Sequence, residues 1–250
     1  MSFDLQALHR RGAIALAAAL ATGTFAVTGG LLVPVAASDK GSGADKGQAS
    51  DDDISATEDL MREHGVLRRA LIVYAELASR LQAGRRDLNL VALAETAKLF
   101  REFGENYHER VLEEQYVFPE VRKTGGPNEK LVEVLLTQHQ RAREITSYLE
   151  RVGARGKIDA DAEPLSRALA SMSRMYHAHA TWEDTVIFPA WRKTQSKSRL
   201  DELAKKFEEM EHQQFGKDGF EDGIERMSRV EEMLGLSDLN FYTAPPPRKI

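Results

Sequence analysis

HERVLEEQYVFP at residues 108–119 and HATWEDTVIFP at residues 179–189 are two copies of one sequence unit. Each copy begins with a histidine, passes through acidic residues and ends in Phe-Pro. Counting back five positions from the phenylalanine gives Glu113 in the first copy and Glu183 in the second. Because a segment with one histidine precedes each copy, the chain reads as two similar halves, each with two histidine-bearing segments.

Apolar residues recur at steps of three and four around both copies, which predicts four long helices. The first helix opens at the capping box formed by residues 55–58 and carries an apolar stripe as far as Ala78. The second runs from after Asp87 to about Val121, the third from near Asn128 to about Arg151, and the fourth follows a loop at 153–161. No alternating β-branched run with hairpin signals interrupts them, so the predicted fold class is all-α, an antiparallel four-helix bundle.

The chain is expected to divide into four parts. Residues 1–37 have the pattern of an export signal, because Arg10-Arg11 precede an uncharged run that ends in the small residues 35–37. Residues 38–54 are rich in Ser, Gly, Asp and Lys and are interpreted as a flexible linker. Residues 55–194 are predicted to form the bundle. Residues 195–250 are predicted to form a C-terminal helical appendix and tail, with helices at 199–215 and 220–234.

The paired arginines resemble a twin-arginine signal, the type that exports proteins already folded around a cofactor. The uncharged run is also long enough to cross a bilayer as an uncleaved anchor, which is the competing interpretation. Its Gly and Ala content favours cleavage just before Ser38. We therefore expect a mature protein without a stable membrane span, located in the periplasm or outside the cell.

Composition excludes several kinds of site. The sequence has no cysteine, which removes disulfides, thiolate nucleophiles, iron–sulfur clusters and cysteine-ligated zinc. It has 39 acidic and 34 basic residues, a net charge of −5, and no basic face with interleaved aromatic residues, so nucleic acid is not an expected partner. A metal bound by this chain must use His, Asp and Glu.

Each predicted bundle helix carries one histidine on which the metal hypothesis rests: His64, His108, His139 and His179. A single histidine on an apolar face is ordinarily a core residue with satisfied hydrogen bonds. Four histidines at similar depth are costly to bury unless each finds a partner, and a shared metal supplies one. Glu183, four residues after His179, projects from the same helical face and can reach the same metal.

The first copy of the unit does not fit a regular α-helix. Glu113 lies five residues after His108, which places its side chain about 140° around an α-helix from the imidazole. A π-bulge that absorbs one extra residue, Val111 or Leu112, would restore a shared face. The alternative is a regular α-helix in which Glu113 faces solvent and Glu109 or Glu114 is the ligand. The gap-free alignment of the two copies from Glu113 onward favours the bulge.

With these residues, the sequence over about 55–193 resembles the hemerythrin-like HHE cation-binding domain. The stretch from His212 to Leu239 is similar to tails found on secreted members of that family. The resemblance implies two iron ions bridged by both glutamates, with manganese or zinc as possible replacements. The implied ligands are His64, His108, Glu113, His139, His179 and Glu183. His177 points to another helix face than His179, and we interpret both His177 and His212 as lying outside the ligand set.

One feature departs from the oxygen-carrying members of the family. Those proteins have five histidines, with a pair four apart on the third helix, whereas Leu135 and Arg143 stand four residues either side of His139. Each iron is then at most about five-coordinate, and open positions favour peroxide or nitric oxide chemistry. The resemblance implies a non-haem di-iron protein that handles O2, peroxide or nitric oxide, as a carrier or a weak oxidoreductase. The alternative is a metal-binding structural, storage or sensing module that acts through a protein partner without turnover.

Overall fold

A computed structural model describes residues 54–158 and 161–248. The predicted signal and nearly all of the predicted linker lie outside the described residues. Within the described part every regular element is a helix, and the predicted all-α class is confirmed. No helix of this part is both long enough and apolar enough to cross a membrane.

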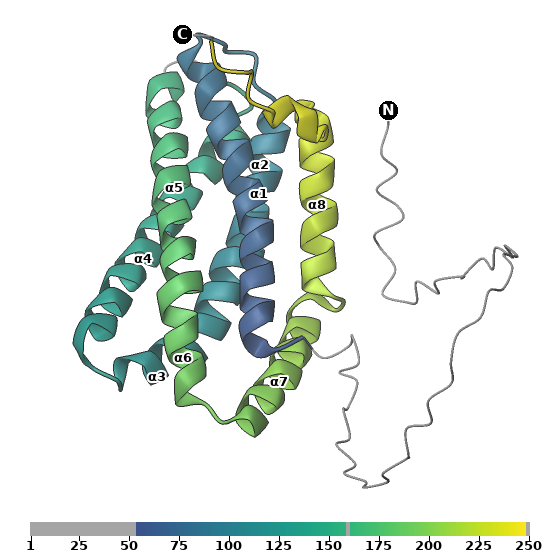
Figure 1. Cartoon of the computed structure of the whole chain (residues 1–250). Helices are drawn as coiled ribbons and strands as arrows, with labels where there is room; N and C mark the ends of the chain where they lie inside the picture. The colour runs from purple at the N-terminus through teal and green to yellow at the C-terminus, as the bar shows by residue number, and fades with distance from the viewer. Residues whose placement is uncertain (1–53, 159–160, 249–250) are drawn as a thin grey trace, which may run out of the picture. The chain divides into compact units, whose positions relative to one another are not determined.

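Four helical arms form the bundle (Figure 1). The first and third arms are the single helices α1 (Ala56–Gln82) and α4 (Gly126–Arg155). The second arm consists of α2 (Leu90–Leu99), the π-helical segment η2 (Phe100–Val117) and α3 (Phe118–Arg122). The fourth consists of α5 (Ala162–Trp182), the short π-helical segment η4 (Glu183–Ile187) and α6 (Phe188–Thr194). The third arm begins two residues before the predicted start and ends four residues after the predicted end.

Local sequence sets the arm boundaries. Ser55 caps α1 by accepting the backbone N–H of Glu58, as the capping box predicts. Gly125 and Gly126 adopt φ values of +67° and +68°, a region that glycine enters without steric cost, and so allow the tight reversal into α4. Gly156 adopts a φ of +70° and ends α4 in a left-handed cap.

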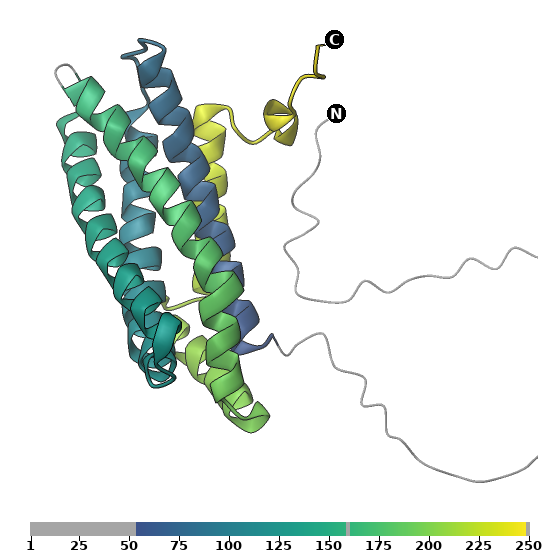
Figure 2. The ribbon, with the colours of Figure 1, turned by 60° about the vertical axis from the view of Figure 1, so that its left-hand side comes forward.

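The C-terminal helices pack directly on the bundle. α7 (Lys197–Phe215) and α8 (Gly219–Leu234) contact α1, α2 and η2, and a short 3-10 turn, η5 (Leu239–Tyr242), follows. Figure 2 shows α8 running alongside α1. Arg69 on α1 makes two hydrogen bonds to Glu231 on α8, and Gly223 lets α8 approach the side chain of Val66. Phe207 on α7 stacks on Trp191, and both are fully buried. The predicted appendix is therefore helical and shares the core of the bundle.

The wide turn predicted between His108 and Glu113 is present, but it is longer than expected. π-helical winding extends over 18 residues in η2, whereas the sequence predicts one inserted residue. The same winding occurs over five residues in η4, in the second copy of the unit. In both copies the phenylalanine N–H donates to a carbonyl five residues back, from Phe118 to Glu113 and from Phe188 to Glu183.

Proline explains why both π-helical segments end at the same point of the unit. Pro119 and Pro189 follow these phenylalanines. In an α-helix a proline ring clashes with the carbonyl four residues earlier and has no N–H to donate. A wider turn just before each proline relieves that clash, so the Phe-Pro pair itself favours the π-helical geometry.

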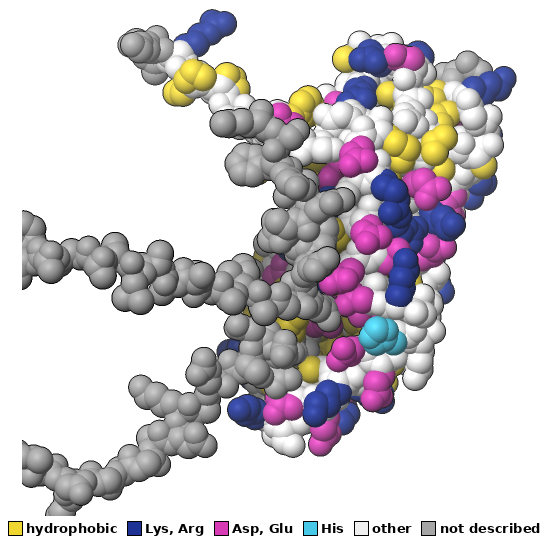
Figure 3. Space-filling view, turned by 90° about the vertical axis from the view of Figure 1, so that its right-hand side faces the viewer, with side chains coloured by type: hydrophobic (Ala, Val, Ile, Leu, Met, Phe, Trp, Pro, Cys, Tyr) yellow, Lys and Arg dark blue, Asp and Glu magenta, His cyan; other side chains and the backbone are white. Residues whose placement is uncertain are grey.

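The surface carries charges of both signs. Figure 3 shows acidic and basic side chains intermixed over one face of the molecule. Ion pairs also form along single helices, such as Arg80 with Glu76 on α1. Pairs of this kind contribute little to stability, and the intermixing gives this face no strong field of one sign.

Candidate metal centre

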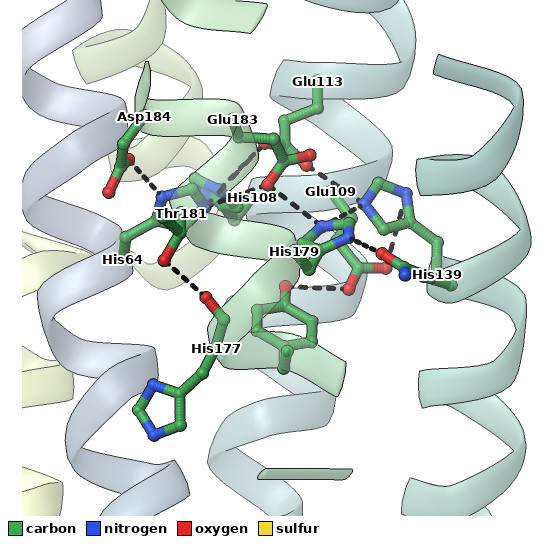
Figure 4. A network of polar contacts seen from close by, with 12 residues as sticks. His64, His108, Glu109, Glu113, His139, His177, His179, Thr181, Glu183 and Asp184 are labelled. Carbon is green, nitrogen blue, oxygen red and sulfur yellow. Dashed lines mark hydrogen bonds and ion pairs between the residues drawn. The ribbon is translucent and has the colours of Figure 1, made fainter. Parts of the chain in front are cut away.

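The four bundle histidines and the two glutamates meet in the interior of the bundle. Each of the six side chains is at most 1% exposed. Figure 4 shows the imidazoles pointing toward one another, with Glu113 and Glu183 beside them. The six residues come from all four arms, namely α1, η2, α4 and the junction of α5 with η4.

The carboxylate of Glu113 contacts imidazoles from both halves of the chain. Its Oε1 lies 3.3 Å from His108 Nε2 and 4.0 Å from His64 Nε2. Its Oε2 lies 3.2 Å from His139 Nε2. The π-helical turn accounts for this placement, because roughly 4.4 residues per turn bring positions five apart to within about 50° of one another.

The carboxylate of Glu183 also joins the halves. Its Oε2 lies 3.0 Å from His179 Nε2 and 3.4 Å from His64 Nε2. The Nε2 atoms of His139 and His179 are 3.1 Å apart. The donor atoms therefore fall into two sets that share Glu113: His64, His108 and Glu113 form one, and Glu113, His139, His179 and Glu183 form the other.

The outward nitrogen of every imidazole has its own acceptor. His64 Nδ1 lies 2.7 Å from Asp184, and His108 Nδ1 lies 2.5 Å from Glu63. His139 Nδ1 lies 2.9 Å from Glu114, and His179 Nδ1 lies 3.0 Å from the amide oxygen of Gln138. With an acceptor at each Nδ1, the proton of the neutral imidazole lies there, and the Nε2 lone pair faces inward. Such outer partners fix the orientation of metal-binding histidines.

The inward donors suit a metal better than they suit one another. Among the described residues, Nε2 of His64 and His108 and all four carboxylate oxygens of Glu113 and Glu183 are buried without a hydrogen-bond partner. Buried polar atoms of native proteins are ordinarily paired, since an unpaired one costs about 1–3 kcal/mol. A satisfied core histidine would use both ring nitrogens. Nitrogen and carboxylate oxygen are the donors that zinc, iron and manganese accept, so the residues fit a site for such a cation.

The phenylalanines of the two copies cover the site symmetrically. Phe118 stacks on His139 with ring centroids 5.4 Å apart, and Phe188 stacks on His64 at 5.4 Å. Each phenylalanine therefore shields an imidazole that belongs to the other half of the chain. Tyr176 packs against His179 at 4.7 Å and donates a hydrogen bond to Glu109. Three of the four imidazoles, those of His64, His139 and His179, thus have a phenylalanine or tyrosine ring packed against them.

Charge pairing dominates the protonation of the metal-free site. Burial lowers the pKa of His139, but the negative charge of Glu109 and the carboxylates of Glu113 and Glu114 beside the two ring nitrogens outweigh burial and raise it to about 10. His108 behaves alike: burial opposes its charge, yet Glu113 and Glu63 raise its pKa well above the ordinary value. Burial disfavours the ionised form of Glu113, but His108 and His139 hold its pKa well below the usual range.

The other histidines and glutamates considered as metal ligands do not point into the cluster. His177 and His212 are exposed, and Figure 4 shows His177 directed away from the cluster. Glu109 is buried, but its oxygens accept hydrogen bonds from Tyr176 and Arg143. Glu114 hydrogen-bonds to Arg143 and to His139 Nδ1. Both alternatives to Glu113 therefore sit beside the outward side of His139, whose Nε2 faces Glu113.

The sequence interpretation missed the outer partners of the histidines, although the repeat contains them. Glu63 and Gln138 immediately precede His64 and His139, and Glu114 and Asp184 immediately follow the two glutamates. The residue before the first histidine of each half contacts the second histidine of the same half. The residue after each glutamate contacts the first histidine of the other half. Matching positions in the two copies could have identified these residues.

Comparison with known proteins agrees with this geometry. The family model described as hemerythrin HHE cation binding domain matches residues 130–238. The chain is 41% identical over 186 residues to "Uncharacterized protein Rv1995" of Mycobacterium tuberculosis (strain ATCC 25618 / H37Rv), an alignment that covers 74% of this chain and 72% of the relative. "Uncharacterized protein Mb2018" of Mycobacterium bovis matches with the same identity and coverage. No solved structure matches the chain.

The family match covers one half of the donor set directly. Residues 130–238 include His139, His179 and Glu183, and the repeated unit places His108 and Glu113 in corresponding positions of the other half. The matched residues form part of a buried cluster of His and Glu on four helical arms, as a cation-binding domain requires. This chain belongs to the hemerythrin HHE cation-binding domain family.

Proposed function

We propose that the protein holds two iron ions in the cluster of four histidines and two glutamates, and that the site handles O2, peroxide or nitric oxide. One observation carries the proposal: the Nε2 atoms of His64 and His108 and the carboxylate oxygens of Glu113 and Glu183 are buried without hydrogen-bond partners in the described structure. Together with His139 and His179 these residues form two donor sets that share Glu113. His64 and His108 would hold one ion, and His139 and His179 the other. Glu113 and Glu183 would bridge them.

The donor chemistry supports iron, with manganese or zinc as the other candidates. Imidazole with carboxylate is the ligand mixture of di-metal carboxylate bundles. Iron bound there supplies reversible changes of oxidation state and open coordination positions for a small oxidant. The number of protein donors supports turnover over simple carriage, because the position four residues after His139 holds Arg143, which hydrogen-bonds to Glu109 and Glu114.

The residues around the cluster restrict what can reach it. Phe118 covers His139, Phe188 covers His64, and Tyr176 packs against His179. These three side chains are at most 1% exposed. A substrate for this site must therefore be small. The aromatic enclosure also keeps bulk water from the donors and strengthens their electrostatic interaction with a bound cation.

Metal content and the absorption spectrum test the proposal. Protein purified without added metal should contain about two irons per chain and show near-ultraviolet charge-transfer bands that shift with azide or peroxide. His179→Ala should lose most of the metal, and the matched control His177→Ala should retain it. Full iron content in His179→Ala would overturn the assignment of the site. A spectrally silent protein loaded with zinc would favour a structural or storage role.

We also propose that the protein is exported before it acts. The paired arginines and the uncharged run that follows them support this proposal. The route fits a metalloprotein, since a twin-arginine type of signal exports folded chains with their cofactor in place. In the periplasm or outside the cell, the mature protein would meet peroxide or nitric oxide before either reached the cytoplasm.

A further inference from the structure

The metal centre has an internal two-fold correspondence that the sequence repeat explains. Glu63 precedes His64 as Gln138 precedes His139, and Arg68 follows its histidine by four residues as Arg143 does. Asp184, which accepts a hydrogen bond from His64, also pairs with Arg68. Glu114, which accepts one from His139, pairs with Arg143. These two arrangements match, because each places one carboxylate and one guanidinium beside the first histidine of its half.

The second histidine of each half breaks the correspondence. His108 Nδ1 contacts the Glu63 carboxylate at 2.5 Å, whereas His179 Nδ1 contacts the amide oxygen of Gln138 at 3.0 Å. Glu63 is fully buried, and in the described chain no arginine or lysine pairs with it. Gln138 is neutral and only half-buried. The two imidazoles therefore differ in the charge of the group that polarises them.

Glu109 is a buried carboxylate of the first copy that has no counterpart in the second, but it does not remove the difference between His108 and His179. Glu109 takes the place that Ala180 holds in the second copy, directly after the histidine. Its two oxygens accept hydrogen bonds from Tyr176 and Arg143. Its Oε2 is 3.9 Å from His139 Nδ1, beyond hydrogen-bonding distance. Glu109 therefore polarises no imidazole through a hydrogen bond, and Glu63 does.

We propose that the two metal positions are unequal, with the His64/His108 position binding the first and more tightly held ion, and that the Glu63/Gln138 pair sets this order. The inference rests on the proposed two-metal site and extends it. A carboxylate that accepts the Nδ1–H of a metal-binding imidazole makes Nε2 a stronger donor, and such outer partners change metal affinity about 10–100-fold. Burial disfavours the ionised form of Glu63 and raises its pKa to about 7, whereas the hydrogen bond with His108 and the charge of that imidazole favour the carboxylate. Glu63 and Gln138 act as positioning residues through the histidines they contact.

Titration of the metal-free full chain with Co2+ against a competing chelator tests the proposal. The wild type should bind two ions with dissociation constants about tenfold or more apart. Glu63→Gln should weaken the tighter step about tenfold and bring the two constants together. Gln138→Glu should strengthen the weaker step several-fold, because it gives His179 a charged acceptor in a less buried place. The double exchange should restore two separated constants.

The outcomes separate this inference from the proposed function. A wild type that binds fewer than two Co2+ ions would overturn both the two-metal site and the inference. Two ions whose constants do not change in Glu63→Gln would overturn the inference alone. A Gln138→Glu variant that binds its second ion no more tightly than the wild type would do the same, because a purely structural role predicts only losses. Circular dichroism of the metal-free variants confirms that each has folded.

Discussion

Binding of a divalent metal should release at least two protons per chain at pH 7. In the metal-free protein the pKa of Glu113 is depressed, so the carboxylate is ionised, while the pKa of His139 is raised to about 10 and that of His108 is raised well above its ordinary value. Both imidazoles are therefore protonated at pH 7. A metal needs their Nε2 lone pairs and displaces both protons.

The expected number of protons released differs clearly from the number that four independent histidines would release. With an ordinary pKa near 6.5, four imidazoles together would carry only about one proton at pH 7. Calorimetric titration with Zn2+ in two buffers of different ionisation enthalpy measures the number released. His177→Ala, which changes an exposed histidine, should release as many protons as the wild type. A release of one proton or fewer would refute the charge-paired state of the metal-free site.

The protons on these imidazoles also determine how the stability of the metal-free protein and its metal affinity change with pH. The folded pKa of His139, about 10, lies above its unfolded value of about 6.5. Its contribution to the stability of the metal-free protein is therefore complete below about pH 6.5 and is lost as the pH rises through 10. Metal affinity should change in the opposite sense and rise with pH over this window, since fewer protons compete for Nε2. Affinity that falls between pH 7 and 9 would contradict the assignment.

Three further results are expected. Glu113→Gln should lose most of the bound metal, because the amide removes the negative charge that lies between His108 and His139. Glu120→Gln, at a partly exposed position with Lys123 as its partner, should retain the metal on metal analysis. Phe188→Ala should lower the free energy of unfolding by about 3–5 kcal/mol in denaturant titrations, since it empties a fully buried site over His64; a loss below about 1 kcal/mol would show that the neighbours close the space. Mass spectrometry of the extracytoplasmic fraction should find a mature N-terminus close to Ser38, and intact chain found only in membranes would favour an uncleaved anchor.

The sequence predicted the helical arms and the convergence of the histidines because both depend on spacing. Burial of one face of a helix imposes steps of three and four, and the same steps place His139 and His179 on the apolar stripes of their helices. The start of α1 could be predicted from Ser55, whose capping role is local. The C-terminal helices were also predicted, at 199–215 and 220–234, but their packing on α1 depends on distant pairs such as Arg69 with Glu231.

The outer partners of the histidines depend on relations between helices that spacing on one helix does not express. Asp184 and His64 lie on different arms, and the same is true of Gln138 and His179. The length of η2 was also underestimated. A count at about 100° per residue gives Glu113 the wrong face, and the sequence alone shows that one residue is extra without showing how far the wider winding spreads.

The Phe-Pro pair shows how one short unit meets several requirements of the site. Proline disfavours the α-helical turn directly before it, which runs from Glu113 to Phe118. In the first copy the wide winding also extends back through His108, and this brings Glu113 to the face of that histidine although the two are five positions apart. In the second copy four residues separate His179 from Glu183, and the turn widens only after the glutamate. The two carboxylates thus reach equivalent positions by different windings. The phenylalanine then covers an imidazole of the opposite half, so each copy supplies one carboxylate to the cluster and shields a histidine of the other copy. Each half therefore contributes three of the six buried His and Glu side chains and one of the two covering phenylalanines.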